Sequence, residues 1–86
     1  MAGKHLILYC LYRNNREKRF GFSVSKKIGK AVVRNRIKRV LREICRLHND
    51  SFKEGYDYIV IPRRNAIKQN FQLLKEEMLR LAQKTK

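Results

Sequence analysis

The sequence predicts an α+β fold, a two-layer sandwich in which two helices cover a small sheet, with the order β-β-α-β-α along the 86-residue chain. Two kinds of pattern predict it: short apolar or alternating runs typical of strands, and apolar residues repeated at helical spacing. The hydrophobic fraction of 43 % is that of an ordinary globular protein, so we expect one small domain spanning residues 1–86. The strand-like runs are 5–12, 19–25 and 56–61, and the helix-like runs are 31–48 and the stretch after Asn70.

The first two strands are predicted from different patterns. Residues 5–12 (HLILYCLY) are apolar and aromatic throughout, which suits a strand covered on both faces. Residues 13–18 are polar and contain an Asn-Asn pair, which favours a turn. Residues 19–25 (RFGFSVS) then alternate, with Phe20 and Phe22 on one side and small residues on the other. We expect this second strand to run antiparallel to the first.

A basic loop, residues 26–30, leads into the first predicted helix, residues 31–48. One side of this helix is apolar and the opposite side is cationic, as expected for a helix that packs by one face. Glu43 stands four residues after Arg39, a spacing that predicts an ion pair between them. The apolar side comprises Val33, Ile37, Val40, Leu41, Ile44 and His48, and the opposite side comprises Asn35, Lys38, Arg39, Arg42 and Arg46.

The third strand and the last helix complete the predicted order. Residues 56–61 (YDYIVI) read as a strand that Pro62 ends, because proline cannot donate to a sheet ladder. Residues 63–65 (RRN) form a second basic loop. Asn70 is a suitable N-cap for the last helix, whose apolar stripe is Phe71, Leu74, Met78 and Leu81.

The net charge of +15 indicates a polyanionic partner, because self-repulsion on this scale does nothing for a fold. Nucleic acid fits better than a membrane, since no segment approaches the ~20 apolar residues of a spanning helix. The charge is concentrated: nine Lys or Arg and one acid, Glu43, lie between Lys26 and Arg46. Most charge runs are simply solvated faces, but such faces normally mix both signs.

Two further features have both a binding and a structural interpretation. Gly29 lets the basic loop approach a ligand closely, beside helical N–H groups that favour an anion. Tyr9, Phe20 and Phe22 are of the type that stacks on unpaired bases. For Phe20 and Phe22 we favour core packing; for Tyr9, with its polar tip, the two interpretations stay balanced.

The sequence offers no catalytic group and no metal site. It contains no zinc-protease motif, nucleotide-binding glycine loop or carboxylate cluster. The adjacent pair Glu76-Glu77 is expected to lie on the surface. Cys10 and Cys45 lack metal-ligand spacing, and we expect buried free thiols in a reducing cytosol.

The stretch FSVSKKIGKAVVRNRIKRVLRE carries a longer pattern than any of these. It resembles the signature of the bacterial ribonuclease P protein family, the small basic partners of a catalytic RNA that removes 5′ leaders from precursor tRNAs. The resemblance covers about residues 5–82. The family pattern K-x-x-G-x-A-V-x-R-N-x-x-K-R-x-x-R-E is met at every fixed position, by Lys26, Gly29, Ala31, Val32, Arg34, Asn35, Lys38, Arg39, Arg42 and Glu43.

The resemblance implies a fold and two sets of binding residues. The fold would be the ribosomal-S5-domain-2-like sandwich, with a left-handed βαβ crossover where general rules predict a right-handed one. The residues expected along the cleft that holds the single-stranded 5′ leader are Tyr9, Ser23, Lys26 and Pro62. The residues expected to face the RNA subunit are Lys27, Lys30, Arg34, Asn35, Arg36, Lys38, Arg39, Arg42 and Arg46.

One departure from the family concerns the N-terminus. Family members usually have an extra N-terminal segment, including a helix with Phe residues that lines the leader cleft, whereas here the first predicted strand begins at about His5. We therefore expect the cleft to lack one wall and apolar sheet surface to be exposed. We expect the missing wall to weaken binding of the leader more than binding of the RNA subunit.

The expected function is that of an accessory subunit of ribonuclease P, an endonuclease whose hydrolysis is carried out by its RNA. Mg²⁺ would be held chiefly by RNA phosphates, and the partners would be ribonuclease P RNA and precursor tRNA in the cytoplasm. We expect neither a membrane nor a small-molecule substrate as partner, and the sequence does not indicate whether the protein forms an oligomer. A small ribosomal or general RNA-binding module would explain the charge and fold equally well, but not the full motif. A protein-only nuclease is a more distant alternative.

Overall fold

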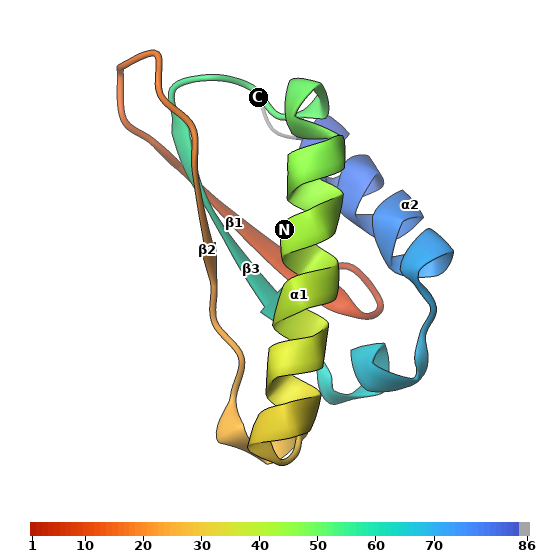
Figure 1. Ribbon diagram of the computed structural model, residues 1–86. Coiled ribbons are helices and arrows are strands. Elements are labelled where there is room, and N and C mark those ends of the chain that lie inside the picture. The colour runs from red at the N-terminus through yellow and green to blue at the C-terminus, as the bar shows by residue number, and fades with distance from the viewer. Residues whose placement is uncertain (85–86) are drawn as a thin grey trace.

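The computed structural model describes residues 1–84 and has the predicted order of elements (Figure 1). Two α-helices and a three-stranded sheet form its framework, and three short 3₁₀ turns connect them. The strands are β1 (Leu6–Tyr12), β2 (Arg19–Phe22) and β3 (Tyr56–Pro62); the helices are α1 (Ala31–Leu47) and α2 (Phe71–Gln83); the 3₁₀ turns are η1 (Lys26–Ile28), η2 (Asn49–Ser51) and η3 (Arg64–Lys68).

The sheet has the strand order β1-β3-β2, so the last strand in sequence lies in the middle. β1 pairs with β3 antiparallel and β2 pairs with β3 parallel. β2 therefore runs antiparallel to β1, as expected, although the two strands do not pair with each other. The connection from β2 through α1 to β3 joins neighbouring parallel strands and is left-handed, as Figure 1 shows.

Both helices cover the same face of the sheet, which makes the fold a two-layer sandwich (Figure 1). The register places Leu8, Val60 and Phe22 in one row on the covered face, where Leu8 and Val60 are completely buried. On the other face the same register places Tyr9 and Ile59 side by side, and Tyr9 is 57 % exposed. The prediction that the first strand is covered on both faces is therefore wrong within the described residues.

The core lies between the sheet and the two helices and includes an aromatic cluster. The rings of Phe20, Phe52 and Tyr58 have their centroids 5.0–5.4 Å apart. The hydroxyl of Tyr58 donates to Lys53 O at 2.8 Å, so this buried ring keeps a partner for its polar tip. The largest fully buried side chains are Tyr58, Leu6, Leu8, Leu41, Ile44, Leu74, Met78 and Val60.

Several boundaries and burial states differ from the predictions. β2 ends at Phe22, although Ser23 N still donates to Val60 O at 3.0 Å. Pro62 is the last residue of β3 and is buried. Cys45 is buried as expected, and burial raises the pKa of its thiol to about 12, whereas Cys10 is only half-buried.

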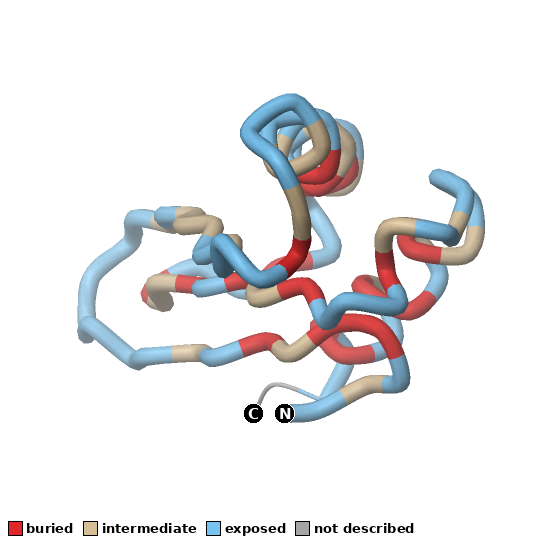
Figure 2. Tube along the Cα trace, turned by 90° about the horizontal axis from the view of Figure 1, so that it is seen from below, coloured by how far each residue is buried: buried red, intermediate tan, exposed pale blue. Residues whose placement is uncertain are grey.

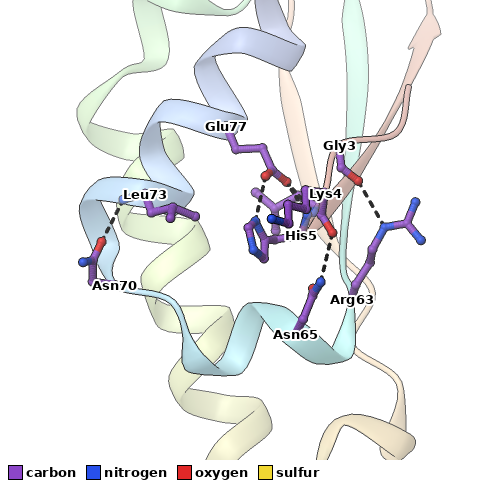
Figure 3. A network of polar contacts seen from close by, with 9 residues as sticks. Gly3, Lys4, His5, Arg63, Asn65, Asn70, Leu73 and Glu77 are labelled. Carbon is purple, nitrogen blue, oxygen red and sulfur yellow. Dashed lines mark hydrogen bonds and ion pairs between the residues drawn. The ribbon is translucent and has the colours of Figure 1, made fainter.

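Glu77 contradicts the prediction of a surface position, because it is buried against the start of β1 (Figure 3). Its Oε2 accepts hydrogen bonds from His5 N at 2.8 Å and Leu6 N at 2.6 Å, and its Oε1 lies 2.9 Å from His5 Nδ1. Gly3 leaves room for this approach, since a Cβ there would lie 2.7 Å from Oε2. One carboxylate thus connects α2 to the N-terminal segment of the chain.

The hydrogen bonds decide the protonation state of Glu77. Desolvation acts to raise the pKa of this carboxyl, but hydrogen bonds from the His5 side chain and from the backbone N–H groups of His5 and Leu6 outweigh it. The net effect is a pKa below the ordinary value. Since the unfolded chain has the higher pKa, the ionised carboxylate stabilises the fold above pH 4.5.

We expect Glu77→Ala to lower the free energy of unfolding by about 2–4 kcal/mol, because it leaves buried N–H donors without an acceptor. Urea unfolding at pH 7 measures the change. Glu77→Gln keeps the shape but removes the charge, so its deficit relative to the wild type should shrink as the pH falls through the folded-state pKa of Glu77. The exposed neighbour provides the control: Glu76→Ala should change stability little, and an equal effect of both substitutions would contradict the anchoring role.

Candidate nucleic-acid interface

The outward face of α1 is strongly cationic. The helix packs through Ile37, Leu41, Ile44 and Cys45, which are all buried. Figure 2, seen from below, shows the buried residues of α1 on the side toward the sheet and exposed residues on the far side. The helical periodicity of the sequence therefore predicted the orientation of α1 correctly.

Most of the predicted RNA-facing residues lie on this outward face. Lys38 and Arg34 are half-buried at its margins. Val33, Val40 and His48, which the sequence placed on the packed side, are also half-buried. The exposed residues of the predicted set are Asn35, Arg36, Arg39, Arg42 and Arg46 on the helix, together with Lys27 and Lys30 before it.

The only acid of this region does not pair with Arg39 as predicted. Instead, Glu43 accepts two hydrogen bonds from Arg46, one of them from Nε to Oε2 at 3.0 Å. The hydrogen bond from Arg46 lowers the pKa of the Glu43 carboxyl, and the same contact raises the pKa of Arg46. The three-residue spacing allows a two-point contact with the planar guanidinium, which explains the choice of partner.

The other cations of the surface have no acidic partner within residues 1–84. The described ion pairs are Glu77 with His5, Asp57 with Arg13, Glu17 with Arg19 and Glu43 with Arg46. Arg34 is the extreme case, because its Nε is shielded from solvent and has no hydrogen-bond partner among the described residues. The positive charge of α1 is therefore available to an anion.

Three contacts hold the basic loop before α1. Ser25 Oγ accepts from Lys27 N at 3.2 Å and caps η1, while Ile28 is buried beneath it. Arg64 donates from Nη2 to Lys27 O at 2.9 Å. This contact brings the second basic loop to the first, and both lie at the end of the molecule where α1 begins (Figure 1).

The second basic loop forms a surface that the sequence indicated only in part. A hollow there is lined by Arg63, Arg64, Asn65 and Lys68. Arg63 donates to Gly3 O at 3.2 Å and Asn65 to Lys4 O at 3.1 Å, so their side chains are tethered to the N-terminal segment. The sequence identified residues 63–65 as basic, but their tethering depends on contacts with distant segments.

The residues predicted for the leader are not all on one surface. Tyr9 is exposed on the uncovered face of the sheet, and Ser23 and Lys26 are exposed beyond the end of β2. Pro62 pairs with Leu6, is buried, and belongs to the face that the helices cover. Tyr9 and the α1 cations thus lie on opposite sides of the sandwich.

Residues 1–84 contain no group of three or more His, Cys, Asp or Glu side chains that could hold a metal ion. Neither α1 nor α2 is long and apolar enough to cross a membrane.

A basic two-layer α+β fold with an unpaired cationic helix face is typical of small proteins that bind nucleic acid. Comparison with known proteins makes the assignment specific. A family model described as Ribonuclease P matches residues 1–86. The chain belongs to the ribonuclease P protein family, and as a protein component of that endoribonuclease complex its partner is ribonuclease P RNA.

Relatives and solved structures agree with this family. The ribonuclease P protein component of Desulforamulus reducens is 43 % identical over 77 residues, covering 90 % of this chain and 68 % of its own. That of Carboxydothermus hydrogenoformans is 44 % identical over 82 residues, covering 92 % and 70 %. The ribonuclease P protein from Thermotoga maritima superposes with a TM-score of 0.94 at 28 % identity, covering 100 % of this chain and 82 % of its own. The ribonuclease P protein from Staphylococcus aureus superposes with a TM-score of 0.79 at 33 % identity, covering 91 % of this chain and 72 % of its own.

Gly29 provides a test of how the loop and α1 fit together. A Cβ at this position would lie 3.3 Å from both Cβ and Cγ1 of Val33. We expect Gly29→Ala to lower the free energy of unfolding by about 1–3 kcal/mol, because the start of α1 must shift to relieve the overpacking. Thermal unfolding measures this. Gly21→Ala is the matched control, since its Cβ would meet neighbours only at 3.9 Å, and an equal loss at both positions would refute the packing argument.

Proposed function

We propose that the outward face of α1 and the loop before it bind the RNA subunit of ribonuclease P, and that the opposite face of the sheet guides the 5′ leader of precursor tRNA. The observation that carries the first part is the unbalanced charge of α1, where Glu43 neutralises Arg46 alone. A fold gains nothing from a row of unpaired cations, whereas a phosphate backbone offers a partner for each.

The chemistry of the side chains supports a phosphate partner. Arg34 and Arg39 each present a planar fork that matches two phosphate oxygens, and Lys30 offers a point charge beside the first turn of α1. The half-buried Arg34 has the most to gain, because its shielded Nε has no acceptor within the described chain. An unpaired buried donor costs free energy, which reorientation toward a phosphate would recover.

The leader would follow the uncovered face of the sheet. Tyr9 is 57 % exposed there, next to Ile59, which is 43 % exposed. An aromatic ring on an open apolar surface is suited to stacking on single-stranded bases. Ser23 and Lys26 lie at the edge of this face, beyond the end of β2. Pro62 lies opposite Leu6 in the pairing of β3 with β1 and is buried on the covered face. This assignment places substrate and RNA subunit on opposite sides of the protein.

The hydrolysis itself would be carried out by the RNA subunit, with water activated by Mg²⁺. We assign these ions to RNA phosphates, because the described residues offer no cluster of carboxylates, histidines or cysteines to hold them. The contribution of this chain is positive charge that stabilises the RNA fold and screens the approach of the polyanionic substrate.

Leader removal by a bacterial ribonuclease P RNA at limiting Mg²⁺ tests the proposal. Adding this chain should stimulate the reaction, and Arg34→Ala with Arg39→Ala should abolish most of the gain. The double variant should also bind the RNA subunit about 10-fold or more weakly, with a salt dependence reduced by about two counterions. Filter binding over a series of salt concentrations measures both quantities.

The matched control removes the same charge from the C-terminal end of α2 and its C-cap, through Arg80→Ala with Lys84→Ala. It should retain the stimulation and most of the affinity. Equal losses in the two double variants would mean that the net charge matters and the α1 face does not, which would contradict the proposal.

If Tyr9 stacks on the leader, Tyr9→Ala should reduce the ratio of the affinity for precursor tRNA to the affinity for mature tRNA. A stacking contact of ~1–3 kcal/mol would account for a loss of about 5- to 150-fold in that preference. Affinities of the holoenzyme for the two tRNAs provide the measurement.

Tyr12→Ala is the control, because Tyr12 is equally exposed, at 61 %, but lies on the other side of the β1 pleat. An unaltered preference in Tyr9→Ala would remove Tyr9 from the leader path without touching the role of α1.

A further inference from the structure

A groove between β2 and α1 combines aromatic, cationic and amide side chains in one place. It is a hollow of about 300 Å³, near the lower end of the range for ligand pockets. β2 is the outer strand of the sheet on this side, so the groove lies at an open edge of the fold. The side chains that line it come from β2 (Phe20 and Phe22), from α1 (Arg42, Cys45 and Arg46) and from η2 (Asn49).

The floor of the groove is apolar. Phe20 is fixed by its stacked and edge contacts with Tyr58 and Phe52, and Cys45 is buried. Burial raises the pKa of the Cys45 thiol to about 12, so the floor carries no charge at neutral pH. Phe22 borders the core and is only half-buried, which leaves part of its ring toward the groove.

Two arginines form the wall on the α1 side. The guanidinium carbon of Arg42 lies 5.9 Å from the centre of the Phe22 ring, the outer limit of a cation–π contact. Arg42 is exposed and has no acidic partner within residues 1–84. Arg46 is held in place by Glu43 at the same end of the helix. The space over Phe22 is therefore bordered by a planar group that can move outward.

A third polar group is held in one orientation. Lys18 Nζ donates to both Asn49 O and Asn49 Oδ1, at 2.8 Å each. Because a lysine ammonium can only donate, this contact identifies the amide oxygen and turns the two Nδ2 hydrogens away from Lys18. Nδ2 has no hydrogen-bond acceptor within the described chain, so it can donate to a group in the groove.

We propose that this groove binds one unpaired nucleobase of the RNA that α1 contacts. The base would lie against the ring of Phe22, with the plane of Arg42 on its other side and the amide of Asn49 at its edge. RNA recognition uses this combination: stacking on aromatic rings and guanidinium planes, with hydrogen bonds to base edges. The inference rests on the proposed function, because it takes the same RNA as ligand.

The charge around the groove selects this occupant. An apolar peptide side chain would gain nothing from the neighbouring cations, whereas the phosphates on either side of a base would meet Arg39 and Lys38 on α1. The α1 face alone would bind phosphates in any sequence. A base inserted beside it fixes the position of the RNA along α1.

The test uses Phe22→Leu, which keeps apolar volume but removes the aromatic face. Affinity for a bacterial ribonuclease P RNA should fall about 5- to 150-fold. The salt dependence of binding should stay unchanged, because no phosphate contact is lost. Dimethyl sulfate probing should reveal a base that the wild-type protein protects and the variant exposes. Arg42→Lys, an exposed substitution that preserves charge and folding, should expose the same base.

Phe71→Leu is the matched control, because Phe71 is 36 % exposed at the start of α2, outside the groove; it should bind as the wild type does. If Phe22→Leu and Arg42→Lys both bind with wild-type affinity and unchanged protections, Arg42 merely fills the groove and the base site is refuted. If the wild type itself fails to bind the RNA, the proposed function fails and the base site falls with it.

Discussion

The parallel pairing of β2 with β3 is the constraint on which the rest of the structure depends. Neighbouring parallel strands cannot be joined by a tight turn, so the chain must cross over the sheet, and here α1 makes that crossing. The crossing helix covers one face and must place its other side in solvent. β3 also pairs with β1 on its second edge, so one strand organises the entire sheet. The cationic surface and the groove beside it both result from this arrangement.

The carboxylate of Glu77 is the second requirement, because it fixes the start of β1 to the helix layer. Its Oε2 accepts from the backbone N–H groups of His5 and Leu6, which lie 72 and 71 positions earlier in the chain. The same segment supplies the carbonyls of Gly3 and Lys4 to which the second basic loop is tethered. A buried acid in α2 thus contributes to the position of cations on the surface.

The sequence predicted what local patterns encode and missed what depends on distant partners. The 3.6-residue period of α1 was sufficient to separate Ile37 and Leu41 from Arg39 and Arg42. The order of the strands was not predictable from alternation, because alternation does not specify the neighbour of a strand. Glu77 read as a surface residue, since its donors come from the other end of the chain. The groove was missed because the alternating pattern assigned Phe20 and Phe22 to the core, although both side chains also line the groove.

Because Tyr9 and the α1 cations lie on opposite faces, the interior of the protein sets the distance between them. Protein cores are close-packed and hardly compressible, so the volumes of side chains such as Leu41 and Val60 set the thickness of the sandwich. In the proposed complex this thickness is the distance between two RNA strands. A change in core volume that leaves stability intact would shift one RNA strand relative to the other. The core would therefore determine the spacing of the two RNA strands as well as the stability of the fold.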